Sequence, residues 1–124
     1  MYDLMIRNAR IVDGTGAPWY RADIAVEGGK IAAIGKLSGE ARETVDAADH
    51  YLAPGFIDIH SHSDDSILAC PAAESRILQG VTTEIAGNCG ASAGPAPEGK
   101  KDGWPGMGAF LSAVEAAAPS VNLG

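Results

Sequence analysis

The first 52 residues alternate short apolar runs with glycine-rich and polar turns, a pattern that predicts small β-strands. The predicted strands are all short and lie at residues 4–6, 10–12, 22–27, 30–34, 44–46 and 51–52. Gly28 and Gly29 join two of these runs, and glycine accepts the positive φ that a two-residue hairpin turn requires. The pattern therefore indicates a β-hairpin within a small β-domain over residues 1–52.

From residue 53 onward the pattern changes to strands that alternate with helices. The predicted elements are a strand at 56–59, a helix at about 65–79, a strand at 81–86, a loop at 87–106, a helix at 107–118 and the opening of a strand at 120–123. Pro71 would lie near the first turn of the first helix or mark a break in it. Gly80 suits the end of the first helix, because glycine takes the left-handed conformation that follows many helices. Two strands joined by a helix form a βαβ unit with parallel strands, so we predict the α/β fold class.

A polar cluster ends the first strand of this βαβ unit. Side chains alternate along a strand, so His60 and His62 are expected on one side and Ser61 on the other. Two imidazoles on one side can hold a metal ion, although a His-x-His pair also occurs by chance and a lone histidine is usually a satisfied polar residue. The apolar strand before the pair and the acidic residues around it favour a metal site.

Three aspartates flank the histidine pair, and we assign them structural roles. We expect Asp58 to brace the strand end, and Asp64 and Asp65 to cap the helix that follows. The alternative for Asp64 and Asp65 is that one of them orients a histidine by a hydrogen bond.

Cys89 follows the second strand of the unit. Parallel strands of a right-handed βαβ unit end on the same face, where parallel barrels build their sites. From His62 to Cys89 the separation is 89 − 62 = 27 residues, close to the roughly 30 residues of a βαβ unit. Imidazole and thiolate both ligate zinc, so we predict that His60, His62 and Cys89 form a zinc site. The alternatives for Cys89 are a buried small residue and a disulfide with Cys70, which a reducing compartment disfavours.

Two motifs resemble those of a known enzyme family. Residues 54–62, Pro-Gly-Phe-Ile-Asp-Ile-His-Ser-His, resemble the signature that opens the barrel of the amidohydrolase superfamily. Residues 80–90, Gly-Val-Thr-Thr-Glu-Ile-Ala-Gly-Asn-Cys-Gly, resemble the N-acyl-D-amino-acid deacylases (D-aminoacylases), in which this cysteine is a zinc ligand. The resemblance covers nearly the whole chain.

The resemblance implies a particular site and reaction. Cys89 would be the main ligand of Zn²⁺, and His60 and His62 would be the ligands of an adjacent, weaker position. Two later histidines and an aspartate that acts as general base are expected beyond residue 124, so no catalytic residue is expected within this chain. Hydroxide activated by the metal would attack the amide carbonyl of a small-molecule N-acyl-D-amino acid, releasing a carboxylate and a D-amino acid.

The resemblance also implies an architecture. Residues 53–124 would be the first βα units of a metal-dependent hydrolase with a (β/α)8 TIM-like barrel, and residues 1–52 the N-terminal part of a small β-sandwich domain. A closed barrel has eight strands, whereas this sequence supplies two and the start of a third. We therefore expect the isolated chain to be inactive and to need the missing C-terminal part of the barrel or a partner chain.

Two other functions stay open at this point. A dihydroorotase-like or hydantoinase-like amidohydrolase would use a carboxylated lysine after the first strands, and Gly-Asn-Cys-Gly at residues 87–90 argues against it. A non-catalytic metal-binding or assembly fragment that pairs with other chains is the alternative from a different class.

The composition of the chain limits the kinds of partner that it is expected to bind. The chain is 46% hydrophobic and 20% charged, which is globular rather than disordered. Its formal net charge of −7 argues against a nucleic-acid partner, which normally meets a basic surface. We see no apolar run of membrane-spanning length, no signal peptide and too few cysteines, 2, for a disulfide scaffold. We therefore expect no membrane association and a cytoplasmic location.

Overall fold

The computed structural model describes residues 1–90, 92–94 and 103–124, so the predicted loop at 87–106 lies partly outside the described residues. Two compact units divide the chain, Met1–Pro54 and Gly55–Gly124. The sequence pattern changes from short strands to alternating strands and helices at residue 53, next to the point where the first unit ends.

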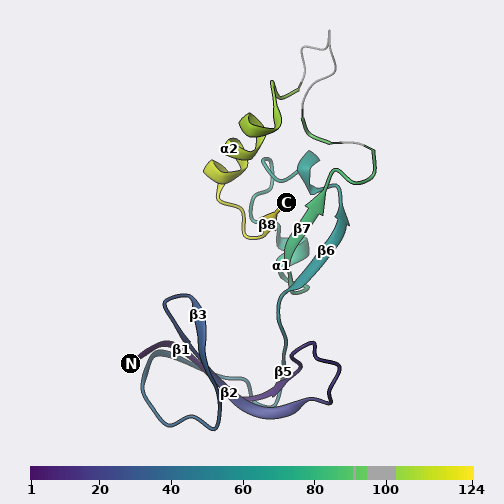
Figure 1. Cartoon of the computed structure of the whole chain (residues 1–124). Coiled ribbons are helices and arrows are strands. Elements are labelled where there is room, and N and C mark those ends of the chain that lie inside the picture. The colour runs from purple at the N-terminus through teal and green to yellow at the C-terminus, as the bar shows by residue number, and fades with distance from the viewer. Residues whose placement is uncertain (91, 95–102) are drawn as a thin grey trace. The chain divides into compact units, whose positions relative to one another are not determined.

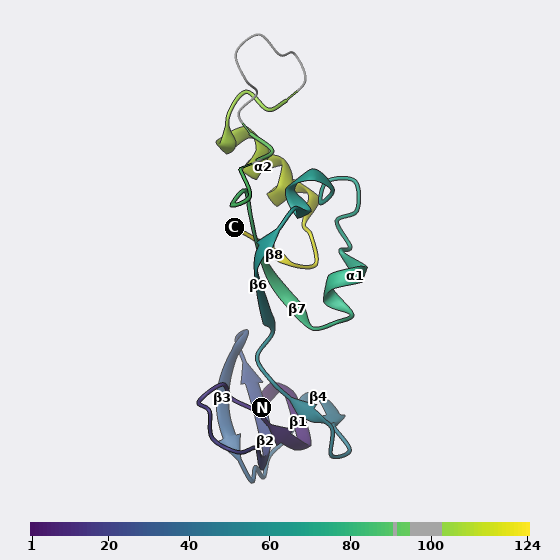
Figure 2. The ribbon, with the colours of Figure 1, turned by 90° about the vertical axis from the view of Figure 1, so that its right-hand side faces the viewer.

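The first unit is a five-stranded sheet, which Figure 2 shows most openly. Its strands are β1 (Tyr2–Ile11), β2 (Tyr20–Glu27), β3 (Lys30–Gly35), β4 (Ala41–Asp46) and β5 (Tyr51–Leu52). The order is β3-β2-β1-β4, with β5 also paired to β1. Pairing is antiparallel between β1 and β2 and between β2 and β3, whereas β4 and β5 run parallel to β1. The predicted hairpin is confirmed, since Gly28 and Gly29 form its turn with φ of 59° and 73°.

Strand β1 joins two runs that the sequence pattern separates. The pattern predicts two strands at residues 4–6 and 10–12, but one strand runs from Tyr2 to Ile11 with a shift of register between Ile6 and Ala9. Asn8 lies in this irregularity with φ of 58°, a left-handed conformation that asparagine tolerates better than most residues. Its backbone N–H donates to the Asp23 carboxylate instead of to the strand ladder. The polar interruption in the sequence is therefore a β-bulge and not a turn.

The second unit is a three-stranded parallel sheet with helices, as Figure 1 shows. In chain order its elements are β6 (Phe56–Ser61), the 3₁₀ turn η1 (Ser63–Asp65), α1 (Glu74–Ile77), β7 (Val81–Ala86), α2 (Met107–Ala117) and β8 (Asn122–Leu123). β7 lies between β6 and β8, and all neighbours are parallel. The predicted α/β class is confirmed. None of the helices in the described ranges is long and apolar enough to cross a membrane.

A small apolar core holds the helices of this unit on the sheet. Its buried members come from the η1–α1 connection, from α2 and from the segment before β8, namely Ile67, Ala73, Phe110, Val114 and Val121. Trp104 packs edge-on against Phe110, with 5.8 Å between ring centroids. The buried members of this core lie in the connections between the strands, and Leu123 of β8 packs against them.

The predicted helix at residues 65–79 is wrong as a continuous element. Only the four-residue helix α1 forms within it, and the 3₁₀ turn η1 ends at its first residue, Asp65. Pro71 has no N–H to donate to a helix, and Ala73 takes a left-handed φ of 44°, so the helical path is broken between the two pieces. The Pro71 carbonyl instead accepts a hydrogen bond of 2.9 Å from the Ser120 N–H. Gly80 ends the second piece with φ of 83°, as predicted.

Candidate metal centre

Two neighbouring parallel strands bring the predicted ligands to one edge of the sheet. Ser61 pairs with Ala86, so β6 and β7 end side by side. His60 lies on β6, His62 follows it, and Cys89 lies in the turn after β7. One ring nitrogen of each histidine and the Cys89 sulfur all lie within 4.8 Å of one another. The structure therefore brings together all three residues singled out in the sequence.

The three side chains form an open cluster. His60 Nε2 lies 2.6 Å from Cys89 Sγ, and the rings of His60 and His62 are tilted at 44° with centroids 6.1 Å apart. All three residues are exposed. A metal ion held here would consequently keep room for a further ligand from solvent or substrate, which catalytic zinc sites require and structural ones do not.

The turn that carries Cys89 depends on its neighbours. Gly87 and Gly90 have φ of 78° and 80°, conformations that other residues rarely adopt. Between them, the Asn88 side-chain amide donates a hydrogen bond to the Ile59 carbonyl on β6. This contact fixes the turn against the neighbouring strand and places Cys89 beside His60. Sequence reasoning assigned no role to Asn88, although an asparagine between glycines and next to a candidate ligand is a usable signal.

A second polar group lies on the opposite side of β6. The Ser61 hydroxyl is buried and donates to Glu84 Oε1 at 3.0 Å. Arg76 Nε, from α1, donates to the same oxygen at 3.0 Å. Sequence reasoning missed both Glu84 and Arg76. The available signal was a single acidic residue within the otherwise uncharged strand at residues 81–86.

Of the three flanking aspartates, Asp58 has the role predicted for it, whereas Asp64 and Asp65 do not. Asp58 Oδ1 accepts a hydrogen bond of 3.0 Å from the His60 N–H, so it braces the strand end as predicted. The capping role of Asp64 and Asp65 is wrong, because neither η1 nor α1 has a side-chain cap and no long helix begins there. Asp64 Oδ2 instead accepts from the Ala93 N–H at 2.9 Å and so anchors the segment after the Cys89 turn.

The two cysteines are both free thiols. Cys70 lies in the connection between η1 and α1 and is not part of the candidate cluster. The disulfide alternative is thus excluded in this structure. Two imidazole nitrogens and one thiol sulfur remain at the edge of the sheet, a donor set that suits zinc better than the harder cations calcium and magnesium. The fold and the site together define a βα domain with a candidate zinc centre at the carboxyl edge of its parallel sheet.

Comparison with known proteins supports the same class. The sequence profile of the amidohydrolase family matches residues 43–122, and the chain belongs to this family. N-acyl-D-glutamate deacylase of Alcaligenes xylosoxydans xylosoxydans is 38% identical over 133 residues, covering 98% of this chain and 27% of that protein.

Two solved structures resemble the fold. N-acyl-D-glutamate deacylase from Bordetella bronchiseptica, in complex with zinc and a phosphonate mimic of the tetrahedral intermediate, superposes with a TM-score of 0.90 at 40% identity. A D-aminoacylase described for its binuclear metal centre superposes with a TM-score of 0.90 at 37% identity. These matches cover 98% and 99% of this chain, but only 28% and 29% of the solved chains. The chain thus spans a little over a quarter of the length of these relatives.

Proposed function

We propose that this chain is the N-terminal part of a zinc-dependent amidohydrolase that hydrolyses the amide bond of N-acyl-D-amino acids. The products would be a carboxylate and a D-amino acid. The observation that carries the proposal is the convergence of His60, His62 and Cys89 within 4.8 Å at one edge of a parallel sheet. Relatives named N-acyl-D-glutamate deacylase and D-aminoacylase, the first of them solved with zinc, support the substrate class and the metal.

Cys89 is the principal ligand in this proposal, and His60 and His62 serve the adjacent position. Zinc, when bound, supplies a Lewis acid that lowers the pKa of water to about 7 and polarises a carbonyl oxygen. Asn88 holds the Cys89 turn against β6 by its bond to the Ile59 carbonyl. Asp58 holds the His60 backbone at 3.0 Å. These contacts hold the Cys89 turn and the His60 backbone, and all three candidate ligands are exposed, where substrate can reach them.

The rest of the machinery is proposed to lie in the remainder of the enzyme. β6, β7 and β8 would be the first strands of a (β/α)8 barrel, and the five-stranded sheet would be part of a small β-sandwich domain. Because the chain spans a little over a quarter of its relatives, we place the general base and the other zinc ligands outside residues 1–124. We further propose a reducing, cytoplasmic location, because 2 cysteines are fewer than a small secreted disulfide scaffold would carry.

A chimaera tests the proposed reaction. Residues 1–124 would replace the matching segment of the N-acyl-D-glutamate deacylase that is 38% identical to this chain. We expect zinc-dependent release of D-glutamate from N-acetyl-D-glutamate, and loss of that release when Cys89→Ala is introduced. Cys70→Ala is the matched control and should leave the release unchanged. A folded, zinc-loaded chimaera that is inactive on N-acyl-D-amino acids, or one that opens hydantoin rings instead, would contradict the proposal.

A direct assay of the isolated chain tests whether the general base lies outside residues 1–124. We expect purified residues 1–124 to bind metal but not to hydrolyse N-acetyl-D-glutamate or N-acetyl-D-methionine. Clear metal-dependent turnover by the isolated chain would show that a general base lies within these residues.

A further inference from the structure

Glu84 is a buried carboxylate that the proposed reaction does not use. It lies on β7 with 1% of its surface exposed, on the side of the sheet away from the candidate ligands. Its Oε1 atom accepts both the Ser61 hydroxyl and Arg76 Nε, each at 3.0 Å. Its Oε2 atom is buried and has no hydrogen-bond partner among the described residues. Burial of a carboxylate is costly even beside a cation, so this group can be tested for a role beyond folding.

The contacts of Ser61 indicate what that role is. Ser61 lies between His60 and His62 in the sequence and is 6% exposed. Its hydroxyl donates to Glu84 and accepts the Ser63 N–H at 3.1 Å. The Ser63 hydroxyl lies 2.8 Å from Ser61 Oγ. Because the Ser61 proton is directed to Glu84, the Ser63 hydroxyl is the donor in this contact. The Ser61 side chain is thus held by three hydrogen bonds.

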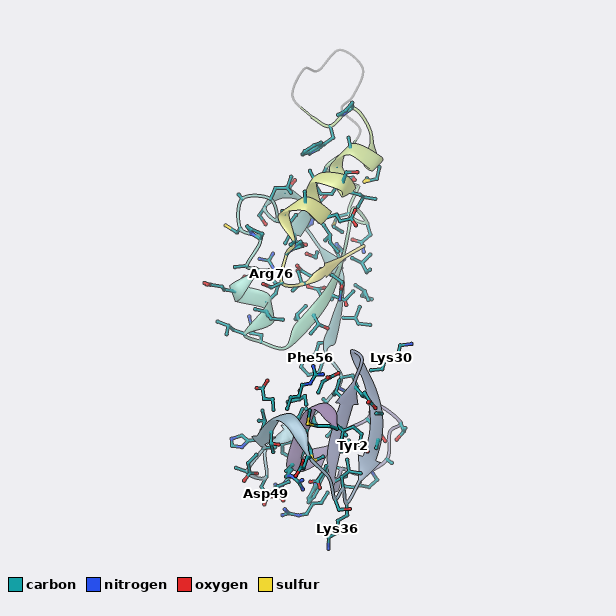
Figure 3. The ribbon with its side chains drawn as sticks, turned by 90° about the vertical axis from the view of Figure 1, so that its left-hand side faces the viewer. Tyr2, Lys30, Lys36, Asp49, Phe56 and Arg76 are labelled. Atoms are coloured by element: carbon teal, nitrogen blue, oxygen red, sulfur yellow. The ribbon has the colours of Figure 1, made fainter. Side chains whose placement is uncertain are left out.

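Fixing Ser61 also fixes the imidazoles. Side chains alternate along a strand, so a Ser61 hydroxyl held on the inner side directs His60 to the outer side. The bond to Ser63 extends this control past the end of β6, where strand geometry no longer orients His62. Arg76 on α1, labelled in Figure 3, provides the charge that holds Glu84 in place.

We propose that Glu84 and Ser61 are positioning residues of the metal centre. Acting from behind the sheet, they hold the end of β6 so that both imidazoles face Cys89. This inference rests on the proposed metal site at His60, His62 and Cys89. It assigns to the buried Ser61–Glu84–Arg76 network a function in metal affinity beyond its contribution to folding.

Cobalt binding to the purified 124-residue chain tests the inference, because a cobalt–thiolate bond gives a charge-transfer absorption in the near ultraviolet. The variants are Ser61→Ala and Glu84→Gln, each titrated with Co²⁺ alone. We expect each to weaken Co²⁺ binding about tenfold, the size typical of contacts that orient metal ligands. Glu84→Gln keeps an oxygen that can accept the Ser61 hydroxyl but loses the charge that pairs with Arg76. The double variant should lose less affinity than the two single losses combined, because Ser61 and Glu84 are coupled through one hydrogen bond.

Two controls separate positioning from general destabilisation. Ser66→Ala removes a neighbouring hydroxyl that contacts the Ser63 carbonyl but neither Ser61 nor Glu84. Val114→Ala weakens the apolar core of the same unit without touching the network. Both should keep the Co²⁺ affinity and the absorption of the unsubstituted chain, although Val114→Ala lowers the denaturant midpoint.

The outcomes distinguish the two proposals. Unchanged Co²⁺ affinity in Ser61→Ala, or an equal loss in Val114→Ala, would overturn the positioning role and leave the metal site standing. If only the chimaera described above binds Co²⁺, the same variants are titrated in the chimaera. Failure of both the unsubstituted chain and the chimaera to bind Co²⁺ would overturn the metal site itself and the positioning role with it. Should Glu84→Gln not fold, Ser61→Ala carries the test, because it removes only one hydroxyl.

Discussion

His60 Nε2 lies 2.6 Å from Cys89 Sγ, although 29 residues separate the two in the chain. The contact arises because β6 and β7 are parallel neighbours, with Ser61 opposite Ala86 at their ends. The Asn88 amide then ties the following turn to the Ile59 carbonyl. The site is therefore a product of strand pairing and one side-chain bridge, and both can be tested by substitution.

Removal of the thiol should have a larger effect than removal of any outer contact. Cys89→Ala deletes the only sulfur donor of the cluster, so we expect Co²⁺ affinity to fall by more than the about tenfold that outer contacts cost. The charge-transfer absorption of the cobalt-loaded chain should vanish altogether. Cys70→Ala, which removes the other free thiol, is the matched control and should preserve both. An unchanged absorption in Cys89→Ala would exclude this residue as a ligand.

Asn88 is expected to act on the site through the turn geometry. Asn88→Ala removes the bond to the Ile59 carbonyl, and we expect Co²⁺ binding to weaken by about tenfold. Asn122→Ala is the control, because the Asn122 amide likewise donates to a neighbouring strand, at the Thr82 carbonyl, but away from the ligands. Each variant should lose about 1 kcal/mol of unfolding free energy. Only Asn88→Ala should lose metal affinity, and equal losses in both would refute the bridging role.

Gly55 should be intolerant of a side chain for steric reasons. A Cβ atom there would meet the Thr82 side chain on β7, with its Cβ at 2.7 Å. We expect Gly55→Ala to destabilise the second unit by about 1–3 kcal/mol, the usual cost of overpacking. Gly108, on α2, has open space around its Cα, so Gly108→Ala should stabilise the unit by about 0.5 kcal/mol. Urea unfolding followed by Trp104 fluorescence measures both, and a neutral Gly55→Ala would contradict the close approach.

Asp49 should make the stability of the first unit depend on pH. Hydrogen bonds from Arg21 lower the pKa of Asp49, and the nearby charge of Arg10 contributes to the same shift. A lowered pKa in the folded state means that the stabilisation is complete above the ordinary value of about 3.9 and is lost as pH falls through the folded value. Asp49→Asn should therefore have a lower unfolding free energy than the unsubstituted chain at neutral pH. This difference in unfolding free energy should disappear as the pH falls below about 4.

Asparagine is chosen at position 49 so that the substitution removes the carboxylate charge without straining the backbone. Asp49 has a left-handed φ of 67°, which asparagine also tolerates. Trp19 reports on this region, because Arg10 lies 5.0 Å from the centre of its ring, and Trp104→Phe removes the other tryptophan signal. Salt should reduce the difference between the two chains, since the ion pair is partly exposed. A difference that stays constant between pH 7 and pH 3 would exclude the ion pair as its cause.

Local patterns in the sequence predicted most strands of both units and the helix α2. The hairpin at Gly28 and Gly29, the strand at residues 81–86 and the end of a helix at Gly80 each follow from the preference of a few residues. The helix at 65–79 failed because apolar spacing outweighed Pro71 in that prediction, and the left-handed Ala73 could not be read from its neighbours. The bulge at Asn8 was missed for a similar reason, since a polar pair inside a strand and a turn between strands look alike in sequence.

The sequence alone determined which atoms can bind a metal, because the residue types and the alternation of His60, Ser61 and His62 are properties of one short segment. It also determined the α/β class through the spacing of two strands around a crossover. Only the tertiary structure decided that Cys89 meets His60, that Asn88 bridges the two strands, and that Glu84 is buried behind Ser61. Those relationships depend on the register between β6 and β7, and register is set by packing between segments about 30 residues apart.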